Sequence, residues 1–133
     1  MMRILFPYIG QPHQTPHSLP IAMEIARRHP NTDVHLACTT QEHLNYVRRL
    51  ASYYPESKVH FSLLHLPLFL RSHVERYGQT PFSRLASLFF NKKYFSTFQG
   101  IVVPERTSAY LRSLGVHDPR LIWTRHGAGD RAI

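Results

Sequence analysis

Short apolar runs alternate along the chain with longer segments in which apolar residues recur at helical spacing. A short apolar run bounded by turn residues is typical of a strand that is buried on both faces of a parallel sheet. We therefore expect five strands, which cover Arg3–Ile9, Asp33–Thr39, Lys58–Leu66, Gly100–Glu105 and Arg120–Thr124.

The segments between these runs predict helices. Ser18 is expected to cap the first helix, with Pro20 in its first turn, where a missing N–H costs nothing. Thr39 and Glu42 have capping-box spacing before the second helix, and Gly115 is expected to end the last one. Between the third and fourth strands we expect a helix over Phe69–Tyr77, a break at Gly78, and a helix from Pro81 to about Phe98.

Strands that alternate with helices indicate an α/β fold with right-handed crossovers. The expected fold class is a Rossmann-like open parallel sheet of about five strands, in the order 3-2-1-4-5, flanked by helices. Residues 1–133 are enough for one such domain, because a chain of this length buries roughly two-thirds of its unfolded surface.

The cysteine content and the absence of long apolar stretches indicate the cellular compartment. The single cysteine, Cys38, forms no internal disulfide and is expected to be a buried core residue, which is typical of a reducing, cytoplasmic compartment. No apolar stretch reaches the roughly 18 residues needed to cross a bilayer, and Met1–Tyr8 lacks the pattern of a signal peptide. We therefore expect a cytoplasmic protein.

The net charge is +8, from 16 basic and 8 acidic residues, and arginine predominates over lysine. This excess favours anionic ligands, and arginine matches phosphate in bidentate geometry. The basic residues are dispersed and form no nucleic-acid-binding motif, so nucleic acid is the least favoured partner.

The most varied chemistry follows the fifth strand, in Arg125–Arg131 (RHGAGDR). In a parallel sheet, ligands bind beyond the carboxyl ends of the strands, so we expect a site loop here. His126 is a candidate general base or phosphate donor. The alternative is a strand-to-helix turn without a ligand. The candidate phosphate or substrate ligands of this segment are Arg125, Gly127, Gly129, Asp130 and Arg131.

Two further loops are expected to open on the same edge, after the first and fourth strands. They contribute the candidate ligand-binding residues Gly10, His13, His17, Glu105 and Arg106. No cofactor is expected in this domain, because the G-x-G-x-x-G fingerprint of a dinucleotide site is absent.

His13 and His17 are four residues apart, a spacing that suits a metal on a helix. Pro12 and Pro16 disfavour a helix there, and no acidic or thiol ligand is adjacent. The sequence therefore predicts no metal site.

The segment Arg84–Phe98 combines aromatic residues with Lys92 and Lys93. Such a mixture is typical of an interfacial membrane anchor, in which Phe89, Phe90 and Phe95 would be exposed. The favoured alternative is that the rings fill the core against the sheet.

The opening segment, RILFPYIGQPHQTPHSLPIAMEI, resembles the start of N-terminal domains of GT-B glycosyltransferases, and GIVVPERTSAYLRSLG followed by LIWTRHGAGDR is similar to the end of such a domain. The stretch His126–Arg131 most resembles the CDP-glycerol glycerophosphotransferase family, the teichoic acid polymerase relatives. Where that family often continues with Thr-Pro after His-Gly, this chain has Ala128-Gly129.

The resemblance implies the N-terminal half of a two-domain GT-B enzyme, in which His126 is catalytic and the missing C-terminal domain binds most of a nucleotide-activated donor. It implies transfer of a sugar or glycerophosphate group to a hydroxyl on a small-molecule or glycan acceptor, in the cytoplasm or at the inner face of the cell membrane. This chain alone is then expected to be inactive. Two alternatives stay open: a non-catalytic, flavodoxin-like module that binds a phosphate ligand, and a domain similar to UDP-N-acetylglucosamine 2-epimerases.

Overall fold

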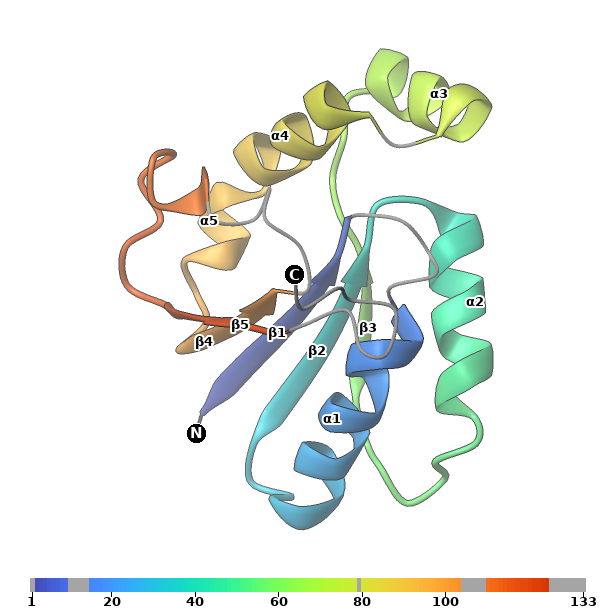
Figure 1. The fold of residues 1–133 in the computed structure, drawn as a ribbon, viewed down its shortest axis with the longest axis vertical. Helices are drawn as coiled ribbons and strands as arrows, with labels where there is room; N and C mark the ends of the chain where they lie inside the picture. The colour runs from blue at the N-terminus through green and yellow to red at the C-terminus, as the bar shows by residue number, and fades with distance from the viewer. Residues whose placement is uncertain (1, 10–14, 79, 104–109, 125–133) are drawn as a thin grey trace, which may run out of the picture.

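The computed structural model describes residues 2–9, 15–78, 80–103 and 110–124. Five parallel strands form one sheet in the order β3-β2-β1-β4-β5 (Figure 1), which confirms the expected fold class and strand order. The third strand is shorter than predicted. The strands are β1 (Arg3–Tyr8), β2 (Asp33–Cys38), β3 (His60–Leu63), β4 (Gly100–Val103) and β5 (Arg120–Trp123).

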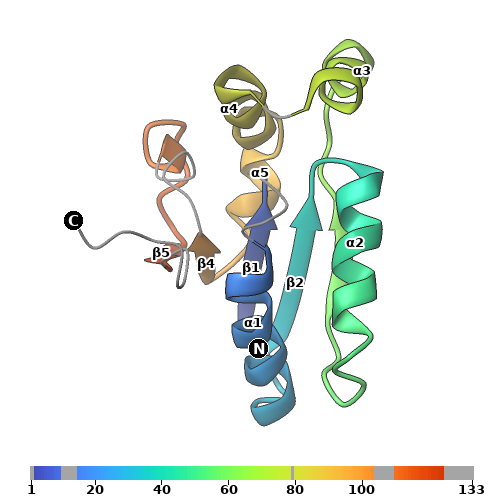
Figure 2. The ribbon, with the colours of Figure 1, turned by 45° about the vertical axis from the view of Figure 1, so that its right-hand side comes forward.

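Helices cover both faces of the sheet, as the two views in Figures 1 and 2 show. On β1, Phe6 and Tyr8 join the core beneath α1 (Thr15–Arg28) and α2 (Gln41–Ala51), because alternate residues of a strand point to opposite faces. Leu5 of the same strand and Ile9, directly after it, join the other core, which contains Phe95 and Phe98. That side carries α4 (Pro81–Phe90) and α5 (Lys92–Phe95), and α3 (Leu68–Tyr77) lies next to α4 at the carboxyl end of the strands.

Two predicted helix starts were wrong by a few residues. Helix α1 already begins at Thr15, so Ser18 lies inside it and donates a hydrogen bond to the Tyr8 hydroxyl instead of capping the helix. Pro20 is therefore an interior, exposed residue of α1. The N-cap of α2 is Thr40, whose side chain accepts from the backbone N–H of His43 at 3.1 Å.

The long helix predicted from Pro81 to about Phe98 is interrupted at Asn91, which separates α4 from α5. The buried side chain of Asn91 accepts from the N–H of His65 and donates to the carbonyls of His65 and Ser87, all between 2.7 and 2.8 Å. Asn91 thus satisfies both backbone groups of His65, and its φ of −120° departs from helical geometry.

The break predicted at Gly78 is confirmed, whereas the helix predicted before Gly115 is, over the described residues 110–115, a short 3-10 segment followed by a turn. Gly78 has a φ of 83° and follows the last residue of α3. Gly115 has a φ of 98°, and the N–H groups of Val116 and Gly115 donate to the carbonyls of Leu111 and Arg112. This pair of hydrogen bonds is a Schellman motif, which requires the left-handed conformation that glycine adopts most easily.

The aromatic segment divides between core and surface. Phe95 and Phe98 are buried, as the core interpretation predicted, so the exposed patch expected for membrane contact loses Phe95. Phe89 and Phe90 remain 47% and 40% exposed. In the part of the chain that the structure describes, no helix is long and apolar enough to span a bilayer.

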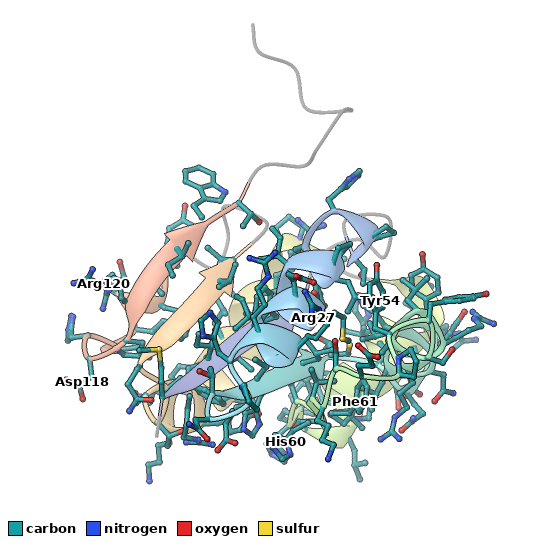
Figure 3. All side chains as sticks on the ribbon, turned by 90° about the horizontal axis from the view of Figure 1, so that it is seen from below. Arg27, Tyr54, His60, Phe61, Asp118 and Arg120 are labelled. Atoms are coloured by element: carbon teal, nitrogen blue, oxygen red, sulfur yellow. The ribbon has the colours of Figure 1, made fainter. Side chains whose placement is uncertain are left out.

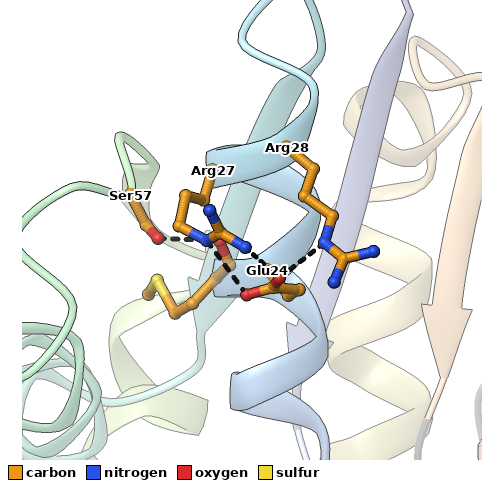
Figure 4. A network of polar contacts seen from close by, with 5 residues as sticks. Glu24, Arg27, Arg28 and Ser57 are labelled. Carbon is orange, nitrogen blue, oxygen red and sulfur yellow. Dashed lines mark hydrogen bonds and ion pairs between the residues drawn. The ribbon is translucent and has the colours of Figure 1, made fainter.

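The outer face of α1 carries a small ionic network (Figure 4). The carboxylate of Glu24 accepts hydrogen bonds from Arg27 and Arg28, which lower its pKa to about 2. Beside it, the hydroxyl of Ser57 donates to the carbonyl of Met23 at 2.7 Å and ties the segment before β3 to α1. Such exposed ion pairs contribute little stability, so the apolar face of α1 holds the helix on the sheet.

Candidate functional site

The five strands are parallel, so their carboxyl ends lie at one edge of the sheet. Three of them, β1, β4 and β5, lead into the segments that the sequence singled out. His17 is the predicted site residue that the structure describes, and it is exposed in the first turn of α1. The other predicted site residues lie outside the described residues: Gly10, His13, Glu105, Arg106, Arg125, His126, Gly127, Gly129, Asp130 and Arg131.

The end of β5 is held firmly up to the start of the predicted motif. The N–H of Thr124 donates to the carbonyl of Val103 at 3.0 Å, which extends the pairing of β4 and β5 by one residue. The Thr124 hydroxyl is buried, and among the described residues it has no hydrogen-bond partner.

Two buried side-chain pairs brace the start of α1. Ser18 donates to the phenol oxygen of Tyr8 at 3.1 Å, and Thr15 Oγ1 lies 2.8 Å from His43 Nε2. Burial raises the pKa of Tyr8 well above its usual value, so this phenol stays protonated at neutral pH. These contacts fix the first turn of α1 to the carboxyl end of β1 and to the start of α2.

His43 is the buried histidine of this edge, with 6% of its surface exposed. Burial lowers its pKa to about 4, because the charged imidazolium is poorly solvated there. The ring is therefore neutral at pH 7, and one of the two groups in the Thr15–His43 contact donates to the other. Its burial goes with the 2.8 Å contact to Thr15, 28 residues away, which no local pattern in the sequence indicates.

Arg71 of α3 joins the ends of two strands. Its guanidinium donates to the carbonyl of Thr39, at 2.7 Å, and to the carbonyl of Leu64. The Thr39 hydroxyl beside it is fully buried, with no hydrogen-bond partner in the described part of the chain. A cation and a buried hydroxyl thus lie at the ends of β2 and β3.

The opposite, amino-terminal edge of the sheet holds a different group. Among the described residues, Asp33, His35 and His60 are the set of three whose ligand atoms lie close enough to hold a metal ion, all within 4.8 Å of one another. Burial lowers the pKa of His35, and the nearby His60 and Arg3 add to this effect. No sequence motif indicates this group, because its members come from two strands that α2 separates along the chain.

The comparisons with known proteins support the fold. The chain is similar to the crystal structure of a glycosyl transferase family 9 protein from Veillonella parvula DSM 2008, with a TM-score of 0.52 and 12% sequence identity. The match covers 94% of this chain and 32% of that one, so the chain spans about a third of the length of that glycosyl transferase. No protein-family model and no curated protein sequence matches the chain. The fold is therefore a Rossmann-like α/β domain of the type found in GT-B glycosyltransferases.

Proposed function

We propose that this chain is the acceptor-side, N-terminal domain of a GT-B-like transferase. The intact enzyme moves a sugar from a nucleotide-activated donor to a hydroxyl group on a small-molecule or glycan acceptor. The observation that carries the proposal is the similarity of 94% of the chain to part of a glycosyl transferase. The sheet order supports it, because ligands of such sheets bind at the carboxyl ends of the strands.

In this proposal His126 removes the proton from the acceptor hydroxyl as that oxygen attacks the donor. Arg125, Arg131 and the backbone amides near Gly127 stabilise negative charge on the departing phosphate. On the other side of the proposed site, the buried Thr15–His43 and Tyr8–Ser18 pairs fix the first turn of α1. Arg71 adds positive charge at the ends of β2 and β3.

Glycerophosphate is the second candidate for the transferred group. It is favoured by the resemblance of His126–Arg131 to CDP-glycerol glycerophosphotransferases. Both groups leave from a nucleotide, so the same base and the same cations serve either reaction. A turnover assay of the intact protein with a sugar nucleotide and with CDP-glycerol as separate donors distinguishes the two.

The test of the catalytic role is His126→Ala in the intact protein. Removal of a positioned general base is expected to lower turnover by about 100-fold or more. The matched control is His117→Ala, which removes an exposed histidine outside the proposed site. The 133-residue chain alone is expected to give no turnover, because the donor-binding half is not part of it.

Near-normal turnover of the His126→Ala variant would remove this residue from the mechanism. If the intact wild-type protein binds a nucleotide or phosphate ligand without turnover, the non-catalytic, flavodoxin-like module is the correct alternative. Isothermal titration of the donor, run beside the turnover assay, separates these two outcomes.

Contact with an anionic membrane surface is part of the same proposal. Phe82, Leu85 and Phe89 are exposed at helical spacing along α4, and the Lys92 ammonium lies 4.9 Å from the centre of the Phe89 ring. Helices α3 and α4 lie at the carboxyl end of the strands in both ribbon views, which is the end of the candidate site (Figures 1 and 2). Rings beside lysines suit the interface of an anionic bilayer.

Vesicle co-sedimentation tests this contact. The Lys92→Glu/Lys93→Glu variant should bind phosphatidylserine vesicles at least about 10-fold more weakly, since each basic residue contributes about 1 kcal/mol at such a surface. An Arg48→Glu/Arg49→Glu variant on α2 carries the same charge change away from the patch and should bind more strongly than the lysine variant. Equal losses in both variants would leave only a general charge effect.

A further inference from the structure

We propose that Asp33, His35 and His60 form a Zn²⁺ site at the amino-terminal edge of the sheet, on the side opposite the candidate transfer site. The ligands are one carboxylate oxygen and two imidazole nitrogens, and water completes the coordination. This donor set matches zinc, which binds histidine and carboxylate in sites of three protein ligands.

The sheet itself brings the three residues together. Asp33 and His35 are two residues apart on β2, so their side chains emerge on the same face of the sheet. The register of the parallel pair places His60, the first residue of β3, directly beside His35. Figure 3, which looks at the molecule from below, labels His60 at this edge.

The distances are close to those of a bound ion. The three candidate ligand atoms all lie within 4.8 Å of one another, and His60 Nε2 is 3.7 Å from an Asp33 carboxylate oxygen. Ligand atoms around a tetrahedral zinc are about 3.4 Å apart, because Zn–N and Zn–O bonds are about 2.0–2.2 Å long. The His35 and His60 rings are stacked, with centroids 4.6 Å apart, so the His60 ring must turn to point its nitrogen at the ion. The His60 side chain is 59% exposed and has room to do so.

The strongest sign of a missing ligand is on His35. Its Nδ1 atom is buried, and it has no hydrogen-bond partner among the described residues. The other side of the ring packs edge-on against Phe98, with centroids 5.0 Å apart, so the ring orientation is fixed by the core. A metal ion would satisfy this nitrogen and would hold β3 to β2.

The guanidinium of Arg3 opposes a cation at this edge, which limits the expected affinity. It donates to the carbonyl of Thr97 at 3.0 Å and lies over the Phe98 ring, 4.4 Å from its centre. These contacts hold Arg3 against the loop before β4. The simpler alternative to a metal site is an ion pair between Asp33 and a protonated His60.

The test is zinc binding to the purified chain, freed of any histidine tag and of metal. Isothermal titration with Zn²⁺ should give a single site, and the melting temperature should rise with Zn²⁺ and fall again with a chelator. His60→Ala and Asp33→Asn should each weaken binding by at least about 10-fold, since even residues that only support metal ligands have effects of this size. His60 is exposed, so its removal should leave the fold intact.

The controls are His73→Ala, an exposed histidine on α3, and a His13→Ala/His17→Ala double variant near the start of α1. Both should bind Zn²⁺ as the wild type does. No binding by the wild-type chain would leave the Asp33–His60 ion pair as the whole role of these residues. Binding that survives His60→Ala, or that is lost with His13 and His17, would place the metal elsewhere. Each of these three results overturns the proposed site.

Discussion

The two faces of the sheet are built differently over β2. On the face toward α1 and α2, Val34, Leu36 and Cys38 are fully buried in one apolar cluster. On the opposite face, Asp33 and His35 keep part of their surface in solvent. One strand thus contributes apolar side chains to a core on one face and a carboxylate and an imidazole to the other face, because its side chains alternate.

The largest expected effect comes from the face of the sheet toward α1 and α2. Leu36→Ala should lower the free energy of unfolding by about 2–5 kcal/mol, because it removes a fully buried side chain and leaves a cavity. Urea unfolding followed by circular dichroism measures the loss. Ser62→Ala, which changes a half-buried residue on the opposite face of the sheet, is the comparison and should cost less than about 1 kcal/mol. Similar losses in both variants would contradict the difference between the faces.

The next prediction concerns His43, a buried residue of α2 on the same side of the sheet. Its pKa is about 4 in the folded chain and about 6.5 when unfolded, so the unfolded state binds more protons in this window. The stability that the neutral ring contributes is therefore fully present above pH 6.5 and is lost as the pH falls toward 4. The loss is about 3 kcal/mol.

The matched variant is His43→Gln, which keeps a polar partner for Thr15 but does not titrate. Urea unfolding between pH 7 and 4 should show the wild type losing stability faster than the variant. Parallel curves would mean that His43 is solvated and charges freely in the folded chain.

The smallest expected effects distinguish two tyrosines on the two faces. The Tyr94 hydroxyl lies 3.3 Å from Ser62 Oγ and is partly accessible, so Tyr94→Phe should cost less than about 1 kcal/mol. The Tyr8 hydroxyl is buried and accepts from Ser18. Tyr8→Phe should cost about 1–3 kcal/mol, because it leaves a buried donor without its partner. Thermal unfolding of both variants tests the order, and a larger effect at Tyr94 would reverse it.

The sheet and its order could be predicted because they depend on local pattern. Apolar runs bounded by turn residues predict the bounds of β1, β2 and β5 to within one residue. The break at Asn91 could not be predicted, since it depends on a hydrogen-bonded exchange with His65, 26 residues away. The start of α1 at Thr15 was hidden for a similar reason, because two prolines disfavour a helix there and the buried contact with His43 supports one.

Of the two candidate sites, one could be predicted from the sequence and the other could not. The carboxyl edge was predicted because parallel topology alone places the loops after β1, β4 and β5 at one edge. The Asp33–His35–His60 group depends on strand register, which pairs residues 25 positions apart and leaves no motif in the sequence. The Thr15–His43 pair was missed because both residues are polar and yet fully or almost fully buried, which runs against their usual exposure.

The position of β1 at the centre of the sheet has a consequence for the time course of folding. Its partner β2 follows after one helix, whereas its other partner, β4, is paired through Ile4 and Gly100, at opposite ends of most of the chain. Closing the longer loop is entropically costlier, so the unit from β1 to β3 should gain structure first and the docking of β4 and β5 should limit the rate. Pulse-labelled hydrogen exchange should then protect the amides of β2 before those of β5, and simultaneous protection would show that the sheet forms in a single step.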